Sequence, residues 1–195
     1  MDRIQKEAWQ NFIAGDSFAF KLIYENQIDG LFDYGCRYTP DHALIKDCIQ
    51  DLFVELNHYR SSLSPEVNVK AYLFTSLRRK LFNQIQKSPN TVDIEDVRFT
   101  PFFSIDTNAE IRIIEKEQSN ELVRRLNLEL KKLTSKQQEV LYLKFNAELS
   151  YDEIAKAMQI SVPTCRTLVY RAIKQLRIKM ESSSMLVLFG IFFSR

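Results

Sequence analysis

The chain has 195 residues, of which 45% are hydrophobic and 27% are charged, as is ordinary for a folded soluble protein. Glycine occurs only 4 times and alternating β-branched runs are nearly absent, which argues against a sheet-rich fold. The formal net charge is only +2, but basic blocks at 70–87 and 161–180 are separate from acidic blocks at 41–55 and 93–117. This separation predicts one surface for nucleic acid and another for a different partner.

The cysteines and the chain ends bear on compartment and cofactors. Cys36, Cys48 and Cys165 form an odd set without metal-ligand spacing, and the last two fall on apolar helix faces, so buried reduced thiols are expected. Residues 1–16 hold no apolar signal-peptide core, which predicts a cytoplasmic protein, and no cofactor or metal is expected. The apolar run at 185–193 is shorter than the ~20 residues of a membrane span. It is expected to dock on the protein's own core or on a partner, with a membrane-surface contact as the alternative.

Helices are expected along the first part of the chain. Apolar spacing predicts one over 2–13, a second that Asp16 or Ser17 caps, and a third that runs to the break at Thr39 and Pro40. The many aromatic side chains of this part are interpreted as core.

The next helix, expected over 41–59, has two distinct faces. One face is apolar, and the other carries acidic residues around an exposed valine. The second face holds Asp47, Gln50, Asp51, Val54 and His58, with Glu55 beside it. Such a face suits a basic partner with an apolar contact at its centre, and a merely solvated face fits the pattern equally well.

Residues 60–69 are expected to form a loop, because Ser, Pro and Asn cluster there. The helix expected over 69–87 contains no acid and has an aromatic ring with cations and an amide on its polar side. These side chains are Tyr72, Arg78, Arg79 and Asn83. The pattern can stack and steer unpaired bases, with a solvated helix as the alternative.

Residues 88–119 read as an acidic linker, after which helical order resumes near 120. A helix–turn–helix unit is expected over 150–180, where Ser150 and Glu153 have the spacing of a capping box and Ser161 can cap the second helix. That second helix has an apolar stripe on one side and a polar face without any acid on the other. The polar face and its flanks carry Thr164, Arg166, Thr167, Tyr170, Arg171 and Lys174. Cations for phosphates, with hydroxyls and guanidinium groups for base edges, are what a helix in a DNA major groove needs.

Taken in order, these blocks resemble the extracytoplasmic-function (ECF) group of the bacterial RNA polymerase sigma-70 superfamily. The D-x-x-Q-D-x-F pattern at 47–53, upstream of K-A-Y-L-F at 70–74, is the most specific part, and K-A-Y-L-F-T is similar to the branch common in Bacteroidetes. The resemblance implies an all-α fold with two small helical domains and a linker. Its expected parts are region 2 over 1–87, a linker over 88–120, region 4 with the helix–turn–helix over 121–181, and an apolar tail over 182–195.

The resemblance also implies a function, that of an alternative sigma factor, which is not an enzyme. The acidic face at 47–55 would dock on the clamp coiled coil of core RNA polymerase, and the loop at 60–69 would capture a flipped base of the −10 element. The side chains that would hold the non-template strand are Tyr72, Arg78, Arg79 and Asn83. Those that would read the −35 element are Thr164, Arg166, Thr167, Arg171 and Lys174. The implied partners are core polymerase, promoter DNA and, for many relatives, an anti-sigma factor.

Three residues depart from the family pattern. Arg79 stands where Asn is usual and Leu168 where Arg is common, which leaves promoter strength and specificity open. Gln159 stands where the turn usually has Gly, so a mildly strained left-handed residue is expected there. Two alternatives remain: a helix–turn–helix regulator that does not dock on polymerase, and a sigma factor that another protein recruits to its targets.

Overall fold

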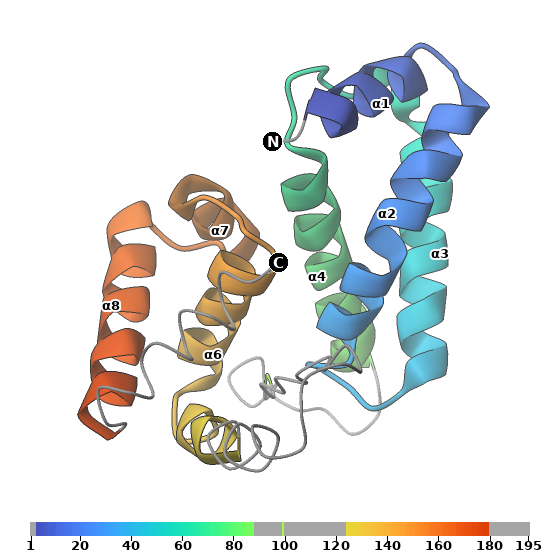
Figure 1. The fold of residues 1–195 in the computed structure, drawn as a ribbon. Coiled ribbons are helices and arrows are strands. Elements are labelled where there is room, and N and C mark those ends of the chain that lie inside the picture. Colours follow the sequence, from blue (N-terminus) through green and yellow to red (C-terminus); the bar gives the residue numbers. More distant parts are fainter. Residues whose placement is uncertain (1–2, 88–98, 100–123, 180–195) are drawn as a thin grey trace, which may run out of the picture. The chain divides into compact units, whose positions relative to one another are not determined.

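The computed structural model describes residues 3–87, 99 and 124–179, and all regular elements in these ranges are helices (Figure 1). The all-α fold predicted from the sequence is confirmed. The chain divides into two compact units, one built on α1 to α4 and the other on α6 to α8. The expected linker at 88–119 and the apolar run at 185–193 lie almost entirely outside the described residues.

The first unit contains four α-helices, whose bounds are α1 (Arg3–Ile13), α2 (Ser17–Gly35), α3 (His42–His58) and α4 (Val69–Lys87). Asp16 caps α2, because its Oδ1 accepts the backbone N–H of Phe18 at 2.8 Å. The carboxylate of Asp41 caps α3 in the same way, accepting from Ala43 and Leu44. The bounds predicted for α4 agree with the structure.

The prediction of two separate helices between 16 and 39 is wrong, because α2 is one continuous helix of 19 residues. Gly30 lies in its middle without ending it. A lone glycine costs a helix only about 1 kcal/mol, and the buried face continues on both sides of it, from Ile23 to Leu31 and Tyr34.

The core of the first unit is rich in aromatic side chains, as the sequence predicted. Trp9 is fully buried, and its indole Nε1 donates to the backbone oxygen of Ser64 at 3.0 Å, which ties α1 to the loop after α3. The loop itself begins with a 3-10 turn, η1 (Arg60–Ser62). Gly35 lets α2 approach α3 closely, since a Cβ atom there would lie 2.5 Å from Cγ2 of Ile45.

The second unit begins with helical residues 124–130 and continues through α6 (Ser135–Leu141), the π-helical turn η2 (Tyr142–Asn146), α7 (Tyr151–Met158) and α8 (Val162–Lys179). Thr134 and Gln137 form a capping box at the start of α6. Buried Gln138 donates from Nε2 to the backbone oxygens of Leu130 and Leu133 at 2.9 and 2.8 Å. These bonds satisfy carbonyls at the end of the preceding helical segment.

The helix–turn–helix predicted from the sequence is present as α7 and α8. Ser150 and Glu153 form the expected capping box, with the Ser150 N–H donating to Glu153 Oε2 at 2.8 Å and the Glu153 N–H donating to Ser150 Oγ at 3.3 Å. Gln159 adopts the expected left-handed conformation, with φ 56°. The N–H groups of Ile160 and Gln159 then return to the carbonyls of Ala155 and Lys156, which is a Schellman motif.

Within the described ranges, none of the helices has both the length and the apolar character needed to cross a bilayer. Cys48 and Cys165 are buried free thiols, as predicted, and Cys36 is partly exposed. Burial raises the pKa of both buried thiols above the usual value, so they stay protonated at neutral pH.

Candidate protein and nucleic-acid interfaces

The acidic face predicted on α3 is a real surface of the first unit. We call it the α3 surface: all five of its residues are exposed, namely Asp47, Gln50, Asp51, Val54 and Glu55. Val54 is 61% exposed, an uncommon degree for a β-branched apolar residue in the middle of a helix. Opposite to it, Ile45, Cys48, Ile49, Leu52, Phe53 and Leu56 are buried. The helix therefore presents an apolar point between carboxylates to solvent.

The acids of the α3 surface differ in their partners. Glu55 accepts an ion-paired hydrogen bond from Nζ of Lys80 on α4 at 2.6 Å. The carboxylates of Asp47 and Asp51 form no hydrogen bond or ion pair with another described residue. Beneath them, burial is the main cause that raises the pKa of the Cys48 thiol, and the negative charges of Asp51 and Asp47 raise it further. The surface is therefore an electronegative one with two unengaged carboxylates.

An open groove of about 770 Å³ lies between α2 and α3 and borders the α3 surface at Gln50 and Val54. Aromatic side chains from both helices line it, including Phe20, Tyr24 and Phe53. The rings of Tyr24 and Phe53 meet edge to face at a centroid distance of 4.9 Å. Sequence reasoning assigned the aromatic residues of α2 to the core and missed this groove. Their i, i+4 spacing at 20 and 24 was the available signal, but only the tertiary structure shows that Tyr24 is 40% exposed.

The residues predicted on α4 fall into two groups. Arg79 and Asn83 are exposed and point away from the buried face of the helix. Tyr72 is half-buried, with its ring 6.0 Å from that of Trp9, and Arg78 has its Cζ 4.4 Å above the ring of Phe82. Tyr72 and Arg78 thus already have aromatic contacts within the protein, and these contacts fix where their side chains lie.

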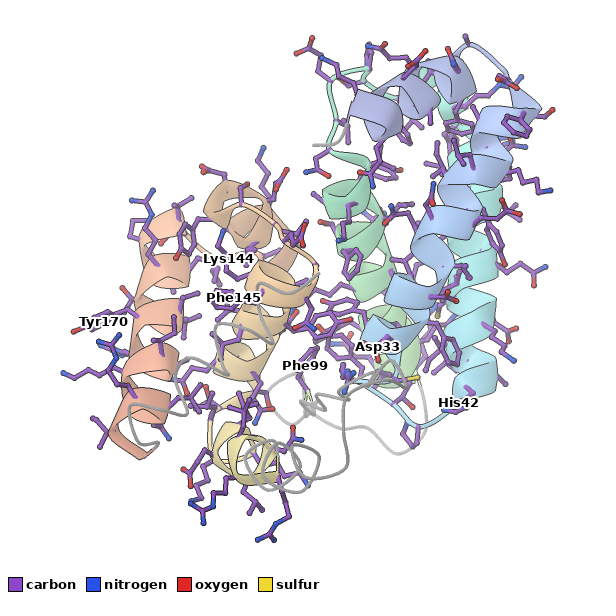
Figure 2. All side chains as sticks on the ribbon, viewed as in Figure 1. Asp33, His42, Phe99, Lys144, Phe145 and Tyr170 are labelled. Carbon is purple, nitrogen blue, oxygen red and sulfur yellow. The ribbon has the colours of Figure 1, made fainter. Side chains whose placement is uncertain are left out.

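The face predicted on α8, which we call the α8 surface, is exposed at each of its assigned positions: Thr164, Arg166, Thr167, Arg171 and Lys174. Cys165, Val169, Ala172 and Leu176 are buried on the opposite side. Tyr170 is 64% exposed and points away from the other helices of its unit (Figure 2). The Nζ atom of Lys174 lies 6.0 Å from its ring centroid. Tyr170 was placed on this face by the sequence but was not assigned a role, and its exposure adds it to the candidate contacts.

Several side chains of the α8 surface are held by neighbours. The hydroxyl groups of Thr164 and Ser161 are hydrogen-bonded to each other at 2.8 Å, and the Thr167 hydroxyl donates to the backbone oxygen of Pro163 at 2.9 Å. Leu168 is half-buried, and it adds no polar group to the surface.

No metal centre emerges from the described part of the chain, because it holds no group of three His, Cys, Asp or Glu residues with the required proximity. The two candidate surfaces differ in charge. One is acidic with an apolar centre, and the other is basic with hydroxyl groups and an exposed aromatic ring.

Comparison with known proteins finds a family match, a similar sequence and a similar fold. Residues 124–176 match the family Sigma-70, region 4. Over 167 residues the chain is 26% identical to the RNA polymerase sigma factor YlaC of Bacillus subtilis (strain 168), a match that spans 83% of this chain and 91% of that protein. Among solved structures, CnrH in complex with the cytosolic domain of CnrY is similar in fold, with a TM-score of 0.59, 19% identity, and coverage of 95% of this chain and 99% of that one. The resemblance to ECF sigma factors drawn from the sequence is thereby confirmed, whereas the Bacteroidetes-like branch stays a prediction.

Proposed function

We propose that this relative of the sigma factors is a dissociable specificity subunit, which binds core RNA polymerase and directs it to promoter DNA. The observation that carries the proposal is the pair of surfaces of opposite charge, acidic on α3 of the first unit and basic on α8 of the second. The relatives are sigma factors, which are not enzymes. The protein would accordingly act through binding, and its binding free energy would drive promoter recognition and strand separation.

The α3 surface would be the polymerase-docking site. Its unengaged carboxylates, Asp47 and Asp51, suit a basic partner, and Val54 between them offers an apolar contact. Complementary charge sets the orientation and rate of such an encounter, while burial of the apolar centre adds affinity. The aromatic groove beside Val54 would extend this contact onto α2.

The α8 surface would read duplex DNA in the major groove. Arg166, Arg171 and Lys174 supply cations, and residues 161–179 contain no acid that would repel phosphates. Arginine can bind guanine O6 and N7 with two hydrogen bonds, and each such contact discriminates between bases by about 1–3 kcal/mol. Binding should weaken steeply with salt, because each neutralised phosphate releases counterions.

Strand separation would fall to α4 of the first unit. Exposed Arg79 and Asn83 can hold a sugar–phosphate backbone, and the half-buried ring of Tyr72 offers a stacking face. Unstacking a base costs a few kcal/mol, and stacking on an aromatic side chain returns about 1–3 kcal/mol per base. The contacts of Tyr72 with Trp9 and of Arg78 with Phe82 favour a preformed surface for the opened strand.

A protein partner that restrains the subunit is also part of the proposal. CnrH, which shares the fold, is seen in complex with the cytosolic domain of CnrY. A comparable partner of this chain would mask one of the two surfaces, and release from it would permit docking on polymerase.

The test of the proposal is pull-down with core RNA polymerase, followed by run-off transcription on genomic fragments. The protein should form a complex with core, and Asp51→Arg should weaken it about tenfold or more, because a like charge then faces the basic partner. Glu25→Arg, a reversal on the exposed side of α2 and outside the groove lining, is the matched control and should leave binding unchanged. Core binding that Asp51→Arg does not affect would overturn the docking site. Absence of core binding by the wild type would favour a regulator that acts without polymerase.

A further inference from the structure

Tyr151, the first residue of α7, lies at the junction of three segments of the second unit. Its ring centroid is 5.6 Å from Cζ of Arg166 on α8 and 4.9 Å from Nζ of Lys144 on η2. Both distances fall within the reach of a cation–π contact. One ring thus contacts cations from an element before the helix–turn–helix and from its second helix.

The backbone around this ring is fixed by local bonds. The Ser150–Glu153 capping box sets the first turn of α7, on which Tyr151 sits. Lys144, labelled in Figure 2, extends from the π-helical turn and donates from Nζ to the backbone oxygen of Leu149 at 3.2 Å. π-helical turns are rare, and their extra residue re-aims the side chains that they carry. The ring and Lys144 therefore form a fixed platform beside α8.

Arg166 depends on this platform more than Lys144 does. Its guanidinium forms no hydrogen bond or ion pair with another described residue, and it lies over the Tyr151 ring. A contact with the face of a ring leaves the guanidinium N–H groups available for a nucleic acid. It also restricts a side chain that otherwise loses much rotamer freedom on binding.

We propose that Tyr151 is a positioning residue, whose ring holds the Arg166 guanidinium in the orientation that contacts duplex DNA. The inference rests on the proposed duplex-reading function of α8. Tyr151 acts through Arg166, and its own hydroxyl has no part in the contact. A purely structural role, in which the ring only packs α7 on its neighbours, is the competing explanation and makes different predictions.

The experiment uses the full-length protein and a duplex that it enriches from a random-sequence library. Fluorescence anisotropy measures the Kd of this duplex for Tyr151→Leu, Tyr151→Phe, Arg166→Ala and the double variant Tyr151→Leu with Arg166→Ala. Tyr59→Leu, at an exposed tyrosine of the first unit that belongs to neither candidate surface, is the matched control. Thermal unfolding shows whether each variant is folded as the wild type is.

Tyr151→Leu should weaken binding about two- to fivefold, the equivalent of one exposed cation–π contact, and Tyr151→Phe and Tyr59→Leu should leave it unchanged. With Arg166→Ala already present, Tyr151→Leu should have no further effect. When the selection is repeated with the variants, Tyr151→Leu should relax the base preference at the same position as Arg166→Ala.

Two results would overturn the inference alone. The first is an equal loss from Tyr151→Leu with and without Arg166, which is the mark of a structural role. The second is a loss from Tyr151→Phe as large as that from Tyr151→Leu, which would assign the effect to the hydroxyl. Failure of the wild-type protein to enrich any duplex would instead overturn the duplex-reading function of α8, and this inference with it.

Discussion

The α3 surface and the α8 surface are both exposed faces of an amphipathic helix, yet they are prepared for binding in different ways. On α3, the side chains of Asp47, Gln50 and Asp51 form no hydrogen bond or ion pair with the rest of the described chain. On α8, the Thr164 and Thr167 hydroxyls are bonded locally, and Arg166 lies against a ring. Apart from Glu55, which is paired with Lys80, the acidic surface is open to a partner as it stands, whereas several side chains of the basic surface are already held by their neighbours.

This difference matches the demands of the two proposed partners. Binding to a basic protein surface mainly requires a complementary electrostatic potential, which the exposed carboxylates of α3 provide. Base edges in a major groove have fixed donor and acceptor positions, so side chains that are ordered beforehand lose less entropy on binding. Order on α8 and openness on α3 are therefore consistent with base reading and with protein docking, respectively.

Replacement of Arg171 should produce the largest loss of duplex affinity, and it should affect the α8 surface alone. Arg171→Ala is expected to cost about 1–3 kcal/mol of duplex affinity, up to roughly a hundredfold in Kd, because exposed Arg171 is a candidate base contact. Anisotropy with a selected duplex measures this loss, and pull-down should show unchanged core polymerase binding. If core binding fell in parallel, the two surfaces would not have separate roles.

A methyl group at Gly35 should disturb the support of the α3 surface. The added Cβ would lie 2.5 Å from Cγ2 of fully buried Ile45, so Gly35→Ala should lower the free energy of unfolding by about 1–2 kcal/mol, the overpacking cost less the gain in helix propensity. Gly30→Ala is the matched control on the same helix. Its nearest neighbour is 3.8 Å away, and it should instead stabilise by up to about 1 kcal/mol. Urea titration measures the free energy of unfolding of both variants. Equal effects would contradict the close approach of α2 to α3 at Gly35.

A glycine at position 159 should relieve the turn that supports the α8 surface. The left-handed conformation at φ 56° costs an ordinary residue about 1–2 kcal/mol, and part of that is offset by the greater freedom of glycine in the unfolded chain. Gln159→Gly is therefore expected to raise the free energy of unfolding by about 0.5–1 kcal/mol. Gln159→Ala keeps the strain and serves as the control. A destabilising effect of the glycine would show that the Gln159 side chain matters more than its backbone.

The buried thiols should report the opposite charges of the two surfaces. Burial is the main cause that raises the pKa of both thiols. Asp51 and Asp47 raise the pKa of Cys48 further against a smaller opposing effect of Lys80, whereas Lys144 and Arg166 partly lower the pKa of Cys165. Salt screens these charges, so added salt should lower the pKa of Cys48 and raise that of Cys165. The ultraviolet absorbance of the thiolate across alkaline pH, in variants that keep only one of the two cysteines, measures both shifts.

The same thiols link stability to pH. A raised folded pKa means that their contribution is complete below the ordinary thiol pKa and is lost as the pH rises through the raised value. The free energy of unfolding should therefore fall on the alkaline side, and Cys48→Ala should make that fall shallower. A salt shift of the same sign at both thiols would contradict the contrast between the surfaces.

Much of the local structure could be predicted from the sequence, because local signals decide it. Apolar spacing gave α4 its bounds, the Ser150–Glu153 capping box is as expected, and the missing glycine at 159 correctly predicted a left-handed residue. The continuity of α2 could not be predicted from the sequence. Gly30 has a low helix propensity, and the burial of Leu31 and Tyr34, which outweighs it, is visible only in the structure.

The parts that sequence reasoning missed depend on contacts between distant residues. The groove between α2 and α3 exists only when both helices are placed side by side, and the pairing of Glu55 with Lys80 joins residues 25 apart. The approach of Arg166 to Tyr151 likewise needs the angle between α7 and α8. No periodicity within one helix encodes these relations.

The ion pair of Glu55 with Lys80 connects α3 to α4 in the first unit. Lys80 follows Arg79 on the helix proposed to hold the opened strand, and its side chain is only 17% exposed while the pair is formed. A partner that binds Glu55 must compete with Lys80, and success would leave an additional unneutralised ammonium group on α4. If a partner docks on α3 and phosphate binds at α4, as proposed, the two equilibria would therefore be linked, because docking would raise the positive charge available on α4.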